Sequence, residues 1–261
     1  MSRIWRHIIN IAFGLILICA LTAAWFLGKA DRSPIVCKGV AITITDSTTN
    51  QFITPDEIRR ILDDEYKGYI GTQIDSIDLA RVEDILDGRS AILKSQAYTT
   101  KDSMLNVVVT QREPVVRFQK GRKGFYADDE GFLFPLQSTY ASHVQIVDGH
   151  IPIEVEKGYI GKPESERERI WLAQMLNVIR YIEGSRTWKD RIVQITVGKD
   201  GGLMMVPREG QERFLFGPPT DVEEKFHKMG LYYKGILKDK GEGHYRWVDL
   251  RYEGQIVCKE K

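Results

Sequence analysis

A run of 21 residues without a single charged side chain, Ile8–Gly28, constrains this 261-residue chain more than any other feature of the sequence. An α-helix needs about 20 predominantly apolar residues to cross the hydrocarbon core of a bilayer. A cleaved signal peptide is the alternative, but its apolar region usually has only about 7–15 residues, and no convincing small-x-small cleavage site follows this run. The sequence therefore predicts a membrane-spanning helix at residues 8–28, preceded by a short cytoplasmic tail at residues 1–7.

The orientation of this helix is not decided by the basic residues around it. Arg3 and Arg6 precede the run, and Lys29 and Arg32 follow it, so the positive-inside count is even. A very short tail before a large C-terminal part still fits a type II signal anchor. We therefore expect the chain from about Lys29 onward to lie outside the cytoplasm.

The overall composition excludes several classes of function. The chain has 37 basic and 36 acidic residues, so it lacks the excess of positive charge that a polybasic nucleic-acid binder needs. Its 43% hydrophobic content is ample for a folded core. The five histidines are scattered without the spacing of metal ligands, and no Gly-x-Ser-x-Gly nucleophile motif is present. We expect no nucleic-acid partner, no small-molecule substrate, no cofactor, no metal site and no enzymatic activity.

Residues 35–118 predict a small α/β domain with elements in the order strand, helix, helix, strand, strand. The segment Thr54–Glu57 combines an N-cap threonine, a proline at the first helical position and a glutamate at the third. Leu105, Val107 and Val109 recur at every second position, as in a strand with one buried face. The expected elements are a strand at 40–44, a helix after Thr54, a helix at 79–86 and a hairpin of strands at 92–98 and 105–109.

Residues 119–258 predict a second, β-rich domain. Asp128–Gly131 and Gly198–Gly202 are turn signals between neighbouring strands. The last segment, His244–Cys258, is predicted to be a strand with a turn near Glu253-Gly254. The other expected strands lie at 124–127, 132–134, 144–147, 192–197, 203–206 and 213–216.

Two helices interrupt these strands. The first, from about Glu164 to Glu183, has an apolar stripe on one face, and the second begins at a capping box, Thr220–Glu223. The fold class is therefore α+β, with a single N-terminal transmembrane helix, a β-α-α-β-β domain and a β-rich domain with helices.

The first domain resembles the POTRA (polypeptide-transport-associated) module, which has the order β-α-α-β-β. The similar segments are FITPDEI at Phe52–Ile58, IDSIDLARVEDIL at Ile74–Leu86 and MLNVVVTQREPVVRF at Met104–Phe118. The last of these is the most specific, because POTRA domains commonly leave their last strand through such a run. On this resemblance, residues 35–118 form a POTRA domain.

The chain as a whole resembles the FtsQ/DivIB family of bacterial cell division proteins. The segment Val248–Tyr252, followed by Gly254 and Val257, is similar to the "VDLRY..G..V" terminus of that family, and the hairpin Phe125–Phe134 is similar to its "D..G..F" element. The resemblance implies a non-enzymatic divisome scaffold that binds FtsB and FtsL and helps to recruit later septum-building proteins. It also implies an inner-membrane protein whose bulk lies in the periplasm at the division site.

A C-terminal strand at a sheet edge would offer unpaired backbone groups to an incoming strand of a partner. The candidate partner-binding residues are Arg251, Tyr252, Gly254, Gln255 and Val257. Tyr252 would supply an aromatic anchor and Arg251 a charge that can pair with a partner carboxylate. Because Tyr252 follows Val248 and Leu250 at period two, a place in the core is an open alternative.

Three further alternatives stay open at the level of sequence. A POTRA-bearing chaperone of outer-membrane protein assembly is the second interpretation, although such proteins usually carry several POTRA repeats and a barrel. The third interpretation is an anchored hydrolase that uses the acidic cluster Asp128–Glu130. The alternative for this cluster is a solvated turn without a catalytic role. Cys37 and Cys258 could form a disulfide, but they belong to different predicted domains.

Overall fold

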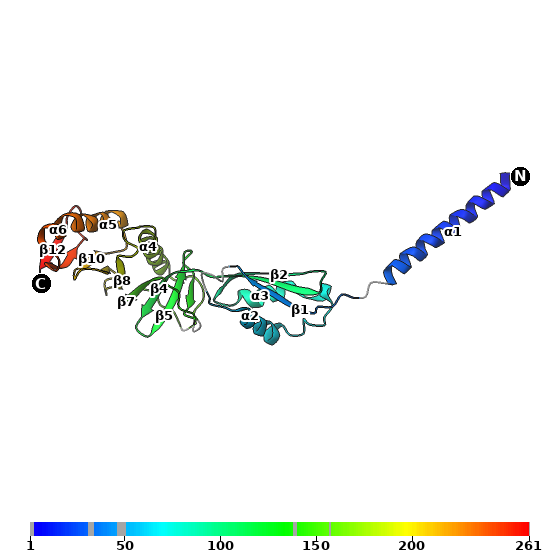
Figure 1. The fold of residues 1–261 in the computed structure, drawn as a ribbon, viewed down its shortest axis with the longest axis horizontal. Coiled ribbons are helices and arrows are strands. Elements are labelled where there is room, and N and C mark those ends of the chain that lie inside the picture. Colours follow the sequence, from blue (N-terminus) through cyan, green and yellow to red (C-terminus); the bar gives the residue numbers. More distant parts are fainter. Residues whose placement is uncertain (1–2, 31–33, 46–50, 138–139, 157, 261) are drawn as a thin grey trace. The chain divides into compact units, whose positions relative to one another are not determined.

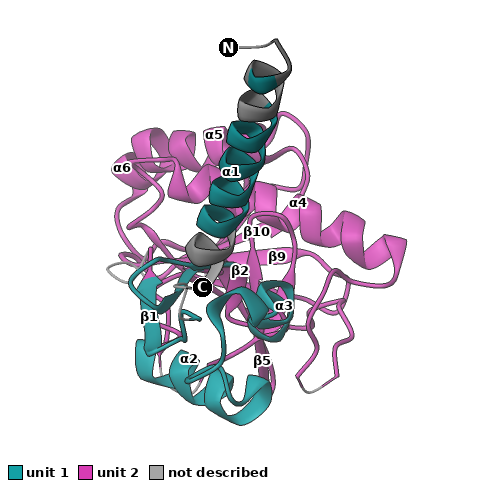
Figure 2. Cartoon of the chain, turned by 90° about the vertical axis from the view of Figure 1, so that its right-hand side faces the viewer, with its two compact units in different colours: residues 1–43, 55–86, 95–109 teal, residues 44–54, 87–94, 110–261 magenta. Residues whose placement is uncertain are grey.

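The computed structural model describes residues 3–30, 34–45, 51–137, 140–156 and 158–260 (Figure 1). The chain divides into two compact units (Figure 2). Unit 1 consists of residues 1–43, 55–86 and 95–109, and unit 2 consists of residues 44–54, 87–94 and 110–261. Each unit is described by itself below.

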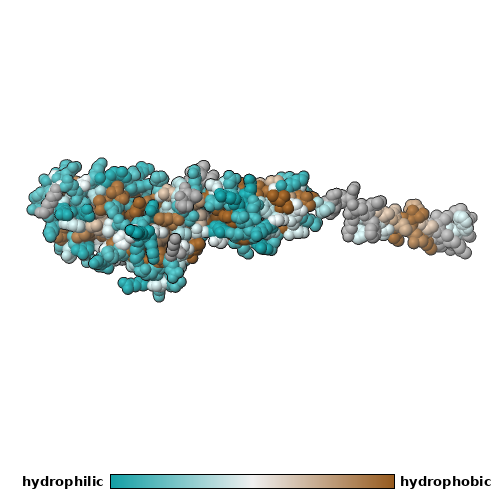
Figure 3. Space-filling model, turned by 90° about the horizontal axis from the view of Figure 1, so that it is seen from below, coloured by the Kyte–Doolittle hydropathy of each residue, from teal (hydrophilic) through white to brown (hydrophobic). Residues whose placement is uncertain are grey.

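The first helix, α1 (Arg3–Ala30), contains the predicted helix at residues 8–28. Its surface is hydrophobic along the described middle part (Figure 3), where Phe13 is 69% and Ile16 is 67% exposed. Across the described ranges, however, no helix combines the length and the hydropathy needed to cross a membrane. The helix is confirmed and its membrane-spanning character is not. Two residues of the predicted tail, Met1 and Ser2, and Arg32 of the orientation argument lie outside the described residues.

A three-stranded sheet with the order β1-β3-β2 lies largely in unit 1, together with two short α-helices. The predicted order of elements is confirmed, and helix α2 begins at the predicted proline, Pro55. The alternation in the last strand is also confirmed, because Leu105, Val107 and Val109 are fully buried. The elements are β1 (Gly39–Ile44), α2 (Pro55–Ile61), η1 (Leu62–Tyr66), η2 (Ile74–Ser76), α3 (Leu79–Asp87), β2 (Ile92–Thr99) and β3 (Met104–Gln111).

Unit 2 is built on a nine-stranded sheet with the order β12-β11-β10-β9-β8-β7-β4-β5-β6. All the short strands expected from the sequence are present, with ends that differ by one or two residues. The strands are β4 (Pro114–Lys120), β5 (Lys123–Asp128), β6 (Leu133–Pro135), β7 (Gln145–Gly149), β8 (Ile192–Val197), β9 (Leu203–Pro207), β10 (Arg213–Gly217), β11 (Tyr245–Asp249) and β12 (Val257–Glu260).

The helices of unit 2 are the crossovers between parallel strands. β7 pairs parallel with β8, and the connection contains α4 (Glu166–Glu183). β10 pairs parallel with β11, and the connection contains α5 (Val222–Leu231), η3 (Tyr232–Ile236) and α6 (Leu237–Lys240). Parallel neighbours require a long connection, because a tight turn can join only antiparallel strands. The buried side chains of α4 and α5 join those of the sheet in one hydrophobic core.

The boundary between the two domains differs from the predicted one at residue 118. Residues 114–120 form β4, which pairs with β5 and β7 in the large sheet. Apolar residues alternate in both strands, but the buried positions are odd-numbered in β3 and even-numbered in β4, so the alternation shifts by one residue where the chain changes sheets. The break falls at Arg112 and Glu113, which belong to neither strand.

The capping box predicted at Thr220–Glu223 is wrong, although a helix does begin there. Asp221 occupies the N-cap position with left-handed backbone angles (φ 52°, ψ 41°) and makes no side-chain cap. Its carboxylate instead accepts a hydrogen bond of 2.9 Å from the Thr220 hydroxyl. The buried Lys225 side chain holds this helix start, because its amino group donates to the carbonyl oxygens of Pro218 (2.8 Å) and Thr220 (2.7 Å).

Candidate interaction surface

The C-terminal hairpin of unit 2 carries all five residues predicted to bind a partner. β11 pairs parallel with β10, and β12 pairs antiparallel with β11, with Val248 opposite Cys258 and Asp249 opposite Val257. β12 comes last in the strand order and therefore forms an edge of the nine-stranded sheet. The predicted turn at Glu253-Gly254 joins the two strands.

The structure answers the question left open for Tyr252. Val248 and Leu250 are fully buried, whereas Tyr252 is 52% exposed. β11 ends at Asp249, so the period-two rule that places alternate residues on one face no longer applies at Tyr252. Tyr252 lies on the surface of unit 2.

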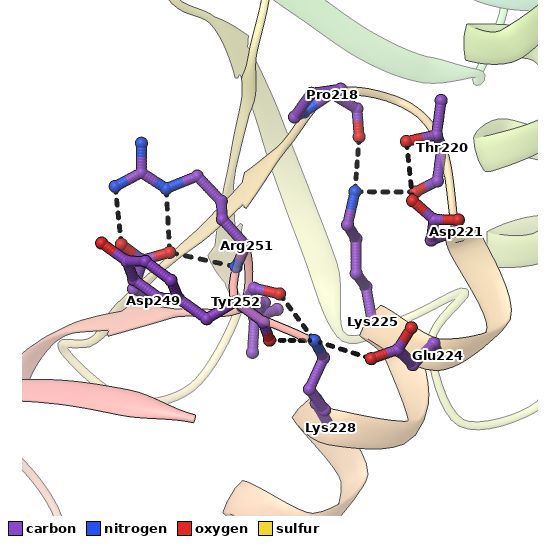
Figure 4. A network of polar contacts seen from close by, with 10 residues as sticks. Pro218, Thr220, Asp221, Glu224, Lys225, Lys228, Asp249, Arg251 and Tyr252 are labelled. Atoms are coloured by element: carbon purple, nitrogen blue, oxygen red, sulfur yellow. Dashed lines mark hydrogen bonds and ion pairs between the residues drawn. The ribbon is translucent and has the colours of Figure 1, made fainter. Parts of the chain in front are cut away.

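A buried lysine on α5 holds the chain that leaves β11 (Figure 4). The amino group of Lys228 donates to the carbonyl oxygens of Leu250 and Tyr252, each at 2.8 Å, and lies 3.0 Å from the Glu224 carboxylate. The Lys228 side chain is only 7% exposed. Hydrogen bonds from Lys228 and from the Gly254 backbone lower the pKa of Glu224. This lysine therefore fixes the backbone from which the Tyr252 side chain projects.

Two of the five candidates belong to the turn. Gly254 has a φ of +62°, a conformation that glycine adopts without a steric penalty. The Gln255 N–H donates to the Tyr252 carbonyl oxygen at 3.4 Å. β12 begins only at Val257, so Gln255 is not a pairing position of the last strand. The residues of β12 that can pair with a partner strand are Val257–Glu260.

Arg251 has a partner within its own chain. Its guanidinium donates to both carboxylate oxygens of Asp249, at 2.9 Å and 2.6 Å, and its backbone N–H donates to the same carboxylate at 3.1 Å. These hydrogen bonds hold the pKa of the Asp249 carboxyl below its usual value. The aliphatic part of Arg251 lies against Gly217, where a Cβ atom would approach the Arg251 Cγ to 2.7 Å. Arg251 therefore braces the turn.

We predict that Arg251→Ala lowers stability by about 1 kcal/mol at neutral pH. A carboxyl whose pKa is depressed on folding stabilises the protein above its unfolded pKa, here near 3.8, and this contribution disappears as the pH falls through the folded pKa. The melting temperatures of the parent and the variant should therefore differ at pH 6, and the difference should shrink as the pH falls below 3.8 through the folded pKa of Asp249. The exposed Arg246 serves as a control, since Arg246→Ala should give the same small change at both pH values.

The side chains of β12 leave the face that carries Val257 free to contact a partner. Cys258 packs against the core of unit 2, and burial raises the pKa of its thiol. Val257, whose side chain points to the opposite face because neighbours in a strand alternate, is 44% exposed.

Cys37 and Cys258 are both free cysteines, in different compact units.

Two family models match the chain. The model described as FtsQ/DivIB, C-terminal related, matches residues 113–259, which is more than half of the chain. The chain belongs to this FtsQ/DivIB-related family. The model of the POTRA-like domain matches residues 35–110. No curated protein matches the chain. The family resemblance inferred from the sequence is thereby confirmed, and the FtsQ/DivIB match covers the nine-stranded sheet from β4 to residue 259 in β12.

The acidic cluster of the FtsQ/DivIB-related domain is engaged in structural contacts. Asp128 is buried, lies 2.7 Å from Arg112, and accepts hydrogen bonds from the backbone N–H groups of Glu130 (3.0 Å) and Phe132 (2.8 Å). Asp129 lies 2.8 Å from Arg180. Within the described ranges, no group of three or more histidine, cysteine, aspartate or glutamate side chains is arranged to hold a metal ion. The cluster shapes the turn between β5 and β6.

Proposed function

We propose that this chain is a non-enzymatic scaffold of the bacterial division machinery, which binds FtsB- and FtsL-like proteins and helps to recruit later division proteins. A role related to division follows from the FtsQ/DivIB-related and POTRA-like matches. The single observation that carries the finer proposal is the edge position of β12 in the domain that matches the family. An edge strand is the part of a sheet to which a partner strand can add.

The proposed contact uses backbone and side chains together. A partner strand pairs with Val257–Glu260 through main-chain hydrogen bonds, and the exposed side chains of Tyr252 and Val257 supply apolar contacts beside it. Asp249, Arg251 and Lys228 do not touch the partner in this arrangement. They fix the turn so that Tyr252 is presented without a large loss of conformational entropy on binding.

We predict that Tyr252→Glu reduces capture of the FtsB-like protein of the same organism by at least about tenfold while the fold is retained. The matched control is Tyr98→Glu, because Tyr98 is 48% exposed on β2 of the other unit. A second pair of variants is Val257→Lys against Val193→Lys, where both valines are exposed but only Val257 lies on the edge strand. Full capture by folded Tyr252→Glu and Val257→Lys variants would exclude this surface as the docking site.

We also propose that residues 8–28 anchor the protein in the cell inner membrane as a single-pass type II protein, with the bulk of the chain in the periplasm. The support is the uncharged Ile8–Gly28 run and the exposed apolar side chains of α1. A reporter that is active only outside the cytoplasm, fused after Lys261, should be active. Activity of a cytoplasmic reporter at the same position would contradict this topology.

A further inference from the structure

Unit 2 contains a buried carboxylate that no described group neutralises. Glu212 lies directly before β10 and is 1% exposed, yet neither of its carboxylate oxygens has a hydrogen-bond partner. Buried acidic side chains are normally paired, because removing a charge from water without a partner is very unfavourable. The buried Glu212 carboxylate is therefore a candidate for binding a ligand.

The local backbone is shaped around this carboxylate. Gly210 has a φ of +96°, and a Cβ atom there would approach the Glu212 Oε1 to 2.6 Å. A Cβ atom at residue 210 would displace the carboxylate from this position, and the loop conformation also favours glycine.

The carboxylate faces a cavity of about 160 Å³ at the start of β10. Its lining also includes Glu209, Glu242, Arg191 and Tyr233, so three carboxylates face one guanidinium and the net charge is −2. The buried Tyr233 hydroxyl has no hydrogen-bond partner either. Burial raises the pKa of Tyr233, the Glu212 carboxylate raises it further through its charge and through a weak hydrogen-bond contribution, and the Arg191 guanidinium lowers it.

Arg191 is the only cation among the described residues that line the cavity, and it is placed against an aromatic ring. Its guanidinium carbon lies 4.4 Å from the centre of the Tyr233 ring, and no ion pair joins Arg191 to Glu212. Leu237 adds an apolar wall. The cavity lining therefore combines the buried Glu212 carboxylate, the Tyr233 hydroxyl, an apolar side chain and two further carboxylates.

We propose that this cavity binds a guanidinium group. Two unpaired carboxylate oxygens match the parallel N–H donors of a guanidinium, and such bidentate pairs are among the strongest hydrogen-bonded contacts in proteins. The Leu237 side accommodates the methylene groups that carry the guanidinium, and Glu209 and Glu242 attract the cation to the entrance. The source of the group is an arginine side chain of a partner or a small free cation.

The competing arrangement is an internal ion pair, in which Arg191 turns to Glu212 in solution. The two arrangements predict opposite effects of Glu212→Gln on the free protein. An unpaired buried carboxylate destabilises the fold, so its neutral isostere should raise the melting temperature by about 2–4 °C. Loss of an internal pair would lower the melting temperature, and this result would overturn the proposal.

Binding is tested by calorimetric titration of the full 261-residue chain in detergent with N-acetyl-arginine-amide and, separately, with methylguanidinium. We expect saturable binding that weakens at least about tenfold in Glu212→Gln and is unchanged in the control Glu223→Gln, an exposed residue of α5. Tighter binding of the arginine amide assigns a side chain as the source, and tighter binding of methylguanidinium assigns a free cation. No saturable binding, or equal binding by Glu212→Gln, would overturn the proposal.

Discussion

Lys228→Met should destabilise unit 2 by about 3 kcal/mol, although it replaces a lysine with an apolar side chain of similar length. The Lys228 amino group donates to the carbonyl oxygens of Leu250 and Tyr252, and methionine leaves both without this donor. Unfolding by urea, followed through the buried Trp171 and Trp188 of unit 2, measures the loss. Hydrogen exchange at Gly254 and Gln255 should also accelerate, because the turn loses its attachment to α5.

The control for this substitution is Lys234→Met, since Lys234 is an exposed lysine in η3 of the same unit. It should change the free energy of unfolding by less than about 0.5 kcal/mol. If Lys228→Met also changed the free energy of unfolding by less than about 0.5 kcal/mol, the carbonyl groups of Leu250 and Tyr252 would have found other donors. Lys228 would then not be needed to hold the turn. Reduced capture of the partner by Lys228→Met, but not by Lys234→Met, would link this brace to the proposed docking surface.

Local elements of this fold could be predicted because their signals are local. The helix predicted at Glu164–Glu183 is α4 at Glu166–Glu183, with an N-cap hydrogen bond from the Glu168 N–H to the Ser165 side chain. The hairpin turn at Gly198–Gly202 is closed by a 2.8 Å hydrogen bond between the Gly198 N–H and the Gly202 carbonyl oxygen. Such signals depend on a few neighbouring residues, and the sequence contains them in full.

The pairing of strands could not be predicted in the same way. The alternation of β10 and β11 shows which residues are buried, but it does not show that the two strands are parallel neighbours. That relation depends on the crossover through α5, η3 and α6, which is a property of the whole unit. The change of sheet between β3 and β4 was also missed, because the one-residue shift of the alternation between the two strands does not show which sheet each strand joins.

The candidate surface was predicted in part. Tyr252 and Val257 are exposed near the edge strand, but Gln255 lies in the turn and Arg251 pairs with Asp249. The period of a strand does not indicate where the strand ends, and that end decides the environment of Tyr252.

The buried lysines of α5 were missed, although one signal could have found them. Val222, Phe226 and Met229 form the apolar stripe of α5, and Lys225 falls within that stripe at the i+3 position. A lysine at a core position of a helix indicates that its amino group finds partners inside the fold. Glu212 offers no comparable signal, because a single glutamate before a strand has the pattern of a surface residue.

Asp128→Ala should destabilise unit 2 by about 3–5 kcal/mol, the range expected when one member of a buried ion pair is removed. The Asp128 and Arg112 side chains are only 10% and 11% exposed, and the Arg112 guanidinium carbon lies 3.7 Å from the centre of the Phe132 ring. Without the carboxylate, Arg112 becomes a buried cation without its charge partner, and the N–H groups of Glu130 and Phe132 lose their acceptor. Urea unfolding of the full chain measures this loss.

Two companion variants separate the buried pair from the rest of the acidic cluster. Asp129→Ala removes a neighbouring carboxylate that pairs with Arg180, but both side chains are more than half exposed, so the loss should stay below about 1 kcal/mol. In the double variant Asp128→Ala with Arg112→Met, the total loss should be smaller than the sum of the single losses, because no uncompensated charge remains buried. Additive losses would show that Arg112 finds another partner when Asp128 is absent. If Asp129→Ala abolished cell division while the fold stayed intact, the cluster would have a role beyond its structural contacts.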